Sequence, residues 1–178
     1  MPLQNLTIID PRSITNEQCP VFVQCADTRS FFGWGIRKRT KSNWNHSTIL
    51  FKKGRLANQA WFFKEIDIAE YMKPGGMMKF WVCGDITIAE RNAIMFKIAY
   101  ELKKPWHSRM YDWPGIVGQF FGLRWFNIPS LNYCSEINIK FIKVLFPEYN
   151  QRHPTPEEID ALFKGSERMG IMGYWMDV

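Results

Sequence analysis

The chain has 178 residues, a length typical of one compact domain. Hydrophobic residues make up 46% of it and aromatic residues 16%, so enough apolar surface is available to build a globular core. The net charge of +6 favours anionic partners in general. The basic residues are scattered, however, and the densest cluster, at positions 37–41, is too short and isolated to indicate a nucleic-acid-binding protein.

Targeting segments and metal-binding motifs are not indicated. The N-terminus lacks a basic region followed by an apolar run, and no stretch of about 18 apolar residues occurs. We therefore expect a cytoplasmic protein without a transmembrane segment, with release by lysis or by a phage route left open. The cysteines are Cys19, Cys25, Cys83 and Cys134. Their spacing contains no CxxC, so we expect reduced thiols, no structural zinc site and no cofactor.

Short apolar segments predict β-strands in the first half of the chain. They occupy positions 6–9, 21–23, 47–51, 56–62 and 80–83. The segment 47–51 has the clearest signal because it is β-branched and apolar, and a polar turn with a glycine separates it from the returning segment 56–62. No element is assigned to the tail at 169–175.

Capping signals predict helices in the second half. Thr87 and Glu90 form a capping box that starts a helix extending to about Lys103. A second, amphipathic helix is expected over residues 134–146. Thr155 and Glu158 form a second capping box with Pro156 at N1, which starts a short helix extending to about Phe163. Because the strands come before the helices, the order predicts an α+β domain with an antiparallel sheet.

Cys134 is the candidate nucleophile. At the first turn of its predicted helix, the helix dipole and the free backbone amides favour a negatively charged sulfur. The amides of Cys134 and Ser135 are also suited to holding an oxyanion during acyl transfer. The other three cysteines are expected to be small buried apolar residues.

His46 is the candidate base, at the start of the strand predicted over 47–51. If the hairpin turn has two residues, His46 pairs with Trp61 and shares a face with Gln59. A turn of three residues would bring Asn58 onto that face instead. We predict that Gln59 orients the imidazole, as the third member of a triad does, with Asn58 as the alternative.

Other catalytic arrangements have weaker support. His107 follows a helix end and His153 stands in a polar turn, so both are expected at the surface. No GxSxG elbow occurs for a serine nucleophile. The carboxylates Glu65, Asp67 and Glu70 are expected in an ordinary solvated stretch rather than in a paired acid–base site.

Several segments carry a resemblance to a known family. They are Ile36-Arg37, Thr40 through His46, Gly54, Gln59-Ala60, Lys104-Pro105-Trp106, Tyr111-Asp112 and Tyr133-Cys134-Ser135-Glu136. The pattern resembles the permuted NlpC/P60 cysteine hydrolases, a circularly permuted papain-like group that includes the YiiX-type amidases. The resemblance covers about residues 31–163 of a single domain. It implies an antiparallel sheet or partial barrel against helices, with the histidine preceding the cysteine. Gln59 departs from the pattern, because an acidic residue is common there.

The resemblance implies a hydrolase that cleaves amide bonds in peptides or cell-wall peptides through a Cys134–His46 pair and an acyl-enzyme. Substrates of this group also include acyl lipids, so a lipid acyltransferase or thioesterase is an alternative. A non-catalytic binding or structural protein of phage type is a further alternative. We expect no nucleic-acid partner. The candidates for oxyanion or substrate contacts are Ser135, Trp44, Tyr111 and Tyr133. The aromatic segment at 106–126 is a candidate wall of the substrate groove.

Overall fold

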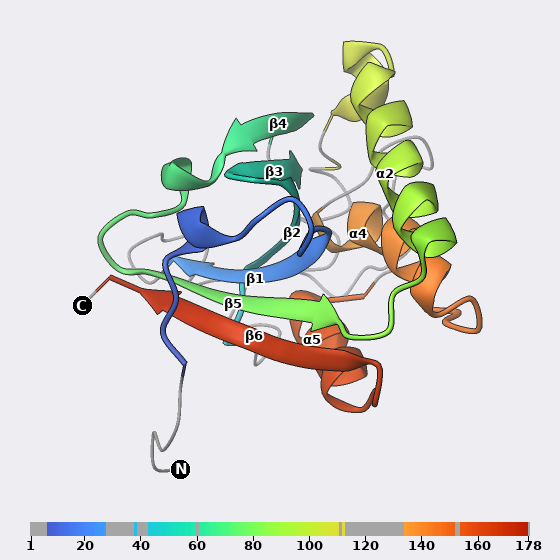
Figure 1. Ribbon diagram of the computed structural model, residues 1–178. Helices are drawn as coiled ribbons and strands as arrows, with labels where there is room; N and C mark the ends of the chain where they lie inside the picture. Colours follow the sequence, from blue (N-terminus) through green and yellow to red (C-terminus); the bar gives the residue numbers. More distant parts are fainter. Residues whose placement is uncertain are drawn as a thin grey trace.

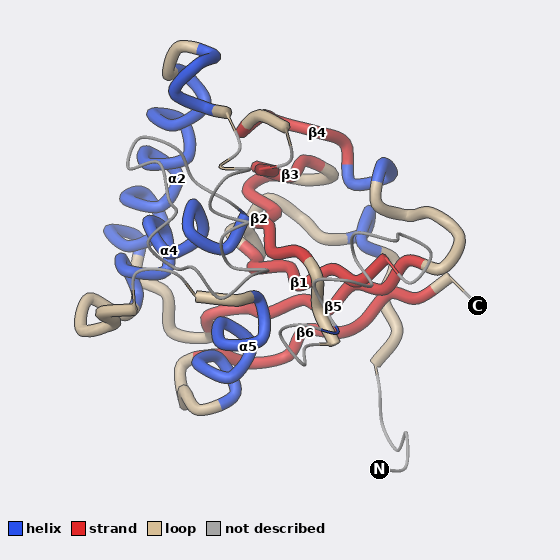
Figure 2. The backbone as a smooth tube through the Cα atoms, turned by 180° about the vertical axis from the view of Figure 1, so that it is seen from behind, coloured by secondary structure: helices blue, strands red, loops and turns tan. Residues whose placement is uncertain are grey.

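The computed structural model describes residues 7–27, 38, 43–59, 61–110, 112, 134–151 and 154–177. This part of the chain is an α+β fold with a six-stranded antiparallel sheet, in agreement with the fold class expected from the sequence (Figure 1). The α-helices gather on one side of the sheet, as the view from behind shows (Figure 2).

The strands are joined in the order β4-β3-β2-β1-β5-β6. Their bounds are Val21–Asp27 (β1), His46–Lys52 (β2), Arg55–Gln59 (β3), Phe63–Asp67 (β4), Gly76–Cys83 (β5) and Met169–Met176 (β6). The expected strand over 56–62 is wrong in extent, because β3 ends at Gln59 and the next strand, β4, begins only at Phe63. Glu65 and Asp67 are exposed as expected, but they belong to edge strand β4. The tail also forms a strand, β6, at the other edge.

The helices among the described residues are α2 at Ile88–Lys103, α4 at Cys134–Leu145 and α5 at Pro156–Lys164. Both predicted capping boxes are present, at the starts of α2 and α5. Three short 3-10 helices are η1 at Pro11–Ser13, η2 at Ile68–Glu70 and η3 at Trp106–Arg109. No helix within the described ranges is both long and apolar enough to cross a bilayer.

Both faces of the sheet are covered, so β2 is buried along most of its length. Ile49 points toward α2, α4 and α5 and joins their apolar residues, whereas its neighbour Leu50 points to a second cluster on the opposite face. The N-terminal segment and η2 contribute to that second cluster. The alternation along β2 therefore decides which side of the sheet each of its residues meets.

A buried ion pair joins the sheet to α5. Nζ of Lys79 lies 2.8 Å from Oδ1 of Asp160, which also accepts the indole N–H of Trp81 at 2.9 Å. Oδ2 of Asp160 lies 2.7 Å from Nζ of Lys164. Burial favours the neutral carboxyl, but the two lysines outweigh burial and hold the pKa of Asp160 below its ordinary value.

The hairpin between β2 and β3 has an irregular register. Ile49 pairs with Ala57 and Leu50 with Leu56, but Lys52 pairs with Arg55, so one extra residue stands in β2. Gly54 makes the turn with a φ of 69°, a conformation that glycine adopts at little cost. The expected pairing of Phe51 with Leu56 is therefore wrong by one residue. Since a one-residue shift reverses the face of every side chain, it brings Asn58 and not Gln59 onto the face of His46.

Candidate active site

The first turn of α4 carries Cys134, and side-chain hydrogen bonds attach the start of this helix to strand β2. Asn138, one turn later, donates from Nδ2 to the carbonyl oxygen of Cys134 at 3.0 Å and to Oγ of Ser47 in β2 at 3.1 Å. On the other side, the hydroxyl of Ser135 donates to the carbonyl oxygen of Pro154, just before α5. These bonds fix the position of Cys134 relative to the start of β2.

His46 is the first residue of β2, and its imidazole lies between two partners. Nε2 is 2.6 Å from Oδ1 of Asn58 in β3. The ring also makes a hydrogen bond with the side chain of Cys134. Because Nε2 is occupied by Asn58, Nδ1 is the nitrogen available to the sulfur. The structure thus brings together His46 and Cys134, which are far apart in the sequence.

Tyr71, just after η2, contacts both His46 and Asn58. Its ring stacks on His46 with centroids 5.6 Å apart and an interplanar angle of 12°. Its hydroxyl donates to Oδ1 of Asn58 at 3.0 Å. An amide oxygen can only accept, so His46 must also donate to it from Nε2–H. This tautomer leaves the Nδ1 lone pair directed to the thiol proton of Cys134.

The electrostatics of the cluster favour a charged imidazole. Burial opposes the charge on His46, but the neighbouring Cys134 thiolate and the hydrogen bonds to Cys134 and Asn58 outweigh burial, so the pKa of His46 is raised. Burial and the nearby thiols Cys25 and Cys134 hold the pKa of Tyr71 well above its ordinary value. Tyr71 therefore stays protonated and remains a donor to Asn58.

The remaining cysteines behave as the sequence predicts. Cys19, Cys25 and Cys83 are all buried. Burial raises the pKa of Cys19 to about 11 and that of Cys83 to about 11. Cys25 is the cross-strand partner of His46 on β1, and burial, followed by the charge of Cys134, raises its pKa as well. Cys25 therefore stays a neutral thiol at neutral pH.

The other predicted site residues occupy different places. Gln59 points away from His46 and donates from Nε2 to the carbonyl oxygens of Arg109 and Met110, at 3.2 and 3.1 Å. The prediction that Gln59 orients the imidazole is corrected accordingly: Asn58 occupies that place, because of the extra residue in β2. Trp44 is buried two residues before His46.

Of the three further candidates Ser135, Tyr111 and Tyr133, the structure describes only Ser135. Ser135 is buried, with its hydroxyl engaged by Pro154. Tyr111, Tyr133 and His153 lie outside the described residues, as does most of the aromatic segment at 106–126. His107 is exposed, as expected.

The surroundings of the cluster include a cavity of about 510 Å³. Asn58, Tyr71 and Cys25 form part of its wall, and Trp61 and Phe62 are also among its lining residues. Cys134 is only 4% exposed, and its side chain contacts the imidazole of His46. The arrangement contains the elements of nucleophilic thiol chemistry: a sulfur at a helix start, a base beside it and an amide that orients the base.

Sequence reasoning did not identify Tyr71 as a site residue. It lies beyond β4 in a turn region without a motif, and only the folding of η2 over the start of β2 places it on His46. The weak signal available was a single aromatic residue before the turn at 73–76. Asn138 was missed too, although its spacing of four from Cys134 puts both on one helix face.

Comparisons with known proteins support the fold and leave the activity open. No protein-family model matches the sequence, and no curated protein is similar to it. The crystal structure of the metalloprotein YiiX from Escherichia coli O157:H7, DUF1105, aligns with a TM-score of 0.59 at 12% sequence identity. The alignment covers 89% of this chain and 98% of that one.

YiiX is described as a metalloprotein. Within the described part, no group of three or more His, Cys, Asp or Glu side chains is arranged to hold a metal ion. The described residues near Cys134 fit a thiol–imidazole pair instead, as the contacts of His46 show. The alignment assigns this protein the permuted papain-like fold of YiiX. In this chain, strand β2 with His46 precedes helix α4 with Cys134.

Proposed function

We propose that this protein is a cysteine-dependent hydrolase that cleaves an amide bond through an acyl-enzyme, as the permuted NlpC/P60 resemblance implies. The observation that carries the proposal is the imidazole of His46, held between the side chain of Cys134 and the amide oxygen of Asn58. A side chain kept only for packing would not require a ring that Asn58 orients and Tyr71 stacks on beside a thiol.

The proposed reaction has two stages. Nδ1 of His46 accepts the thiol proton of Cys134, and the thiolate attacks the carbonyl carbon of the substrate. The tetrahedral oxyanion lies next to the first turn of α4, where the backbone amides of Cys134 and Ser135 are suited to hold it. The imidazolium then protonates the leaving amine, and a thioester to Cys134 remains. Water, deprotonated by His46, hydrolyses the thioester and regenerates the thiol.

Asn58 and Tyr71 act on this reaction through His46. By accepting Nε2–H, Asn58 keeps Nδ1 directed at the sulfur and stabilises the imidazolium when it forms. As a neutral amide it adds less stabilisation than a carboxylate would. Tyr71 keeps the Asn58 oxygen in place and covers one face of the ring.

A second candidate is an acyl-lipid hydrolase or transferase that uses the same pair. The cavity beside Asn58 favours it, because Trp61, Phe62 and Ile66 give its wall an apolar portion suited to a hydrocarbon chain. In that case the thioester of Cys134 would be transferred to a lipid or water acceptor. Incubation with muropeptides and with lipid extracts, followed by mass spectrometry of the intact protein and of the products, separates the two candidates.

The proposed chemistry is tested by alkylation with iodoacetamide at pH 6, followed by peptide mass spectrometry. An ordinary thiol is only about 0.3% thiolate at that pH, so thiols without a charged partner react slowly. The imidazolium form of His46 persists above pH 6.5, because its pKa is raised. We expect Cys134 to react at least about tenfold faster than the other three cysteines, which serve as controls within the same chain.

The variant His46→Gln keeps a side chain of similar reach without the cationic ring. We expect it to lower the alkylation rate of Cys134 at pH 6 by about tenfold or more, while the rates of the other thiols stay the same. Slow and equal labelling of all four cysteines in the wild type would contradict the proposed thiol chemistry.

A further inference from the structure

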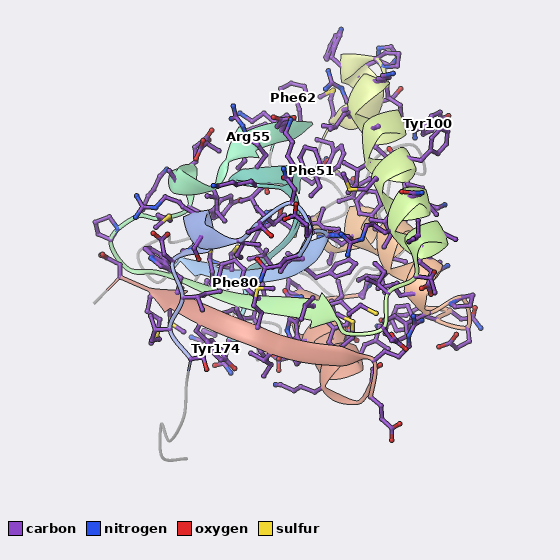
Figure 3. All side chains as sticks on the ribbon, viewed as in Figure 1. Phe51, Arg55, Phe62, Phe80, Tyr100 and Tyr174 are labelled. Carbon is purple, nitrogen blue, oxygen red and sulfur yellow. The ribbon has the colours of Figure 1, made fainter. Side chains whose placement is uncertain are left out.

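The outward side of α2 is aromatic where a helix on the surface of a globular protein normally presents charged residues. Its inner face is buried through Ile94 and Ile98. On the outer face, Phe96 is 73% exposed and Tyr100 is 58% exposed. Figure 3 shows Tyr100 projecting from α2 on the side away from the sheet. The exposure is therefore a property of a well-formed helix and not of a chain end.

Two more aromatic side chains are exposed beyond the end of α2. Trp106 in η3 is 62% exposed, and its ring meets that of Phe62 edge-on with centroids 6.3 Å apart. Phe62 precedes β4 and lies on the sheet side of α2 in Figure 3, whereas Tyr100 lies on the other side. We call the surface formed by Phe96 and Tyr100 on α2 the aromatic face. Exposed aromatic groups gathered in one region mark an interaction site more often than scattered ones do.

The charges around the aromatic face have one sign. Lys97 and Lys103 are exposed on α2. From position 91 to 110 the only acidic residue is Glu101, and it is buried against Lys104 and Lys140 at 2.8 and 3.2 Å. Across the described outer side of α2, lysines therefore accompany aromatic rings without a competing carboxylate.

We propose that the aromatic face docks on an anionic phospholipid bilayer. Tyrosine is suited to the headgroup region because its ring is apolar and its hydroxyl is polar, and phenylalanine contributes apolar area beside it. Lysines beside them are attracted to anionic lipids, and the two effects together give stable interfacial binding. The helix is about 24 Å long, from its rise per residue, so it can lie along the membrane plane.

The alternatives fit these charges less well. A second copy of the chain would bring the same lysines face to face in an isologous contact, and like charges would oppose it. A nucleic acid would need a basic groove to follow its phosphates, whereas these cations flank a convex helix.

The test is co-sedimentation of the full chain with large vesicles of phosphatidylcholine, with and without added phosphatidylglycerol. We expect binding to the vesicles that contain phosphatidylglycerol, weaker binding to phosphatidylcholine alone, and a decrease with rising salt. The double variant Phe96→Ser/Tyr100→Ser should lower the partition coefficient by about tenfold or more. The double variant Lys97→Glu/Lys103→Glu should abolish the preference for phosphatidylglycerol.

The matched control is Ile171→Ser, which removes another exposed apolar side chain, 47% exposed on β6 at the opposite edge of the sheet from β4. This variant should bind as the wild type does, and circular dichroism should show all variants folded. Wild-type protein that stays in the supernatant at low salt, or a Phe96→Ser/Tyr100→Ser variant that still binds fully, overturns the proposal. Two other results would also overturn it: dimerisation that depends on the same residues, or oligonucleotide binding that depends on them and is tighter than vesicle binding. Cys134→Ala should bind normally, so this result is independent of the thiol chemistry.

Discussion

Replacement of Asn58 with alanine is the sharpest test of the geometry around His46. Oδ1 of Asn58 is the shared acceptor for Nε2 of His46 at 2.6 Å and for the hydroxyl of Tyr71 at 3.0 Å. Asn58 itself is only 2% exposed, so water can replace its oxygen only from the side of the cavity that it lines. The substitution therefore removes one acceptor and leaves two donors without a partner in a largely dry place.

Two effects of different size follow. Each buried donor left unpaired costs about 1–3 kcal/mol, so the unfolding free energy should fall by about 2–4 kcal/mol once partial access of water to Tyr71 is allowed for. A hydrogen bond to the charged form of His46 contributes about 1.5–3 kcal/mol. Since 1.36 kcal/mol is a factor of ten, the alkylation rate of Cys134 at pH 6 should fall by about ten- to a hundredfold.

The matched variant is Gln59→Ala, because Gln59 is the adjacent residue and also a buried amide. It should lower stability, since the carbonyl oxygens of Arg109 and Met110 lose their donor. It should leave the reactivity of Cys134 unchanged. Urea denaturation and iodoacetamide alkylation of both variants separate the two roles.

The opposite pattern would refute the reasoning. If Gln59→Ala lost thiol reactivity while Asn58→Ala kept it, the register of the β2–β3 hairpin would be the one first expected from a two-residue turn. If both variants reacted like the wild type, neither amide would orient His46.

The remaining predictions concern the framework around the site. Asp160→Ala should lower the unfolding free energy by about 3–5 kcal/mol in urea denaturation, because it leaves Lys79 buried and unpaired. The pKa of Asp160 in the folded protein lies below its ordinary value, so Asp160 stabilises the fold at neutral pH and this contribution is lost as the pH falls through the folded-state pKa. Asp160→Asn should remove this acid dependence of stability. Gly76→Ala should destabilise by about 1–3 kcal/mol, because a Cβ would lie 2.9 and 3.0 Å from two carbonyl oxygens of the turn that carries Tyr71. Gly170→Ala, with nothing within 4 Å, should show no such loss in the same denaturation assay.

The sequence by itself determined the elements whose causes are local. The capping boxes at Thr87 and Thr155 depend on residues three apart, and both helices begin where those boxes predict. The apolar spacing after Cys134 likewise placed α4 correctly. The pairing of an early histidine with a late cysteine was anticipated, because the local settings of His46 and Cys134 suggested complementary roles.

The tertiary structure decided what depends on how distant segments meet. The choice between Asn58 and Gln59 was fixed by one extra residue in β2, and the face of a strand reverses with a single step of register. Strand β6 forms because β5 offers it a partner, although its own sequence has no clear alternation. Tyr71 reaches His46 only when η2 folds back over the sheet, a contact that no local pattern specifies. Local propensity thus places the nucleophile at a helix start and the base at a strand start, whereas strand pairing selects the amide that orients the base.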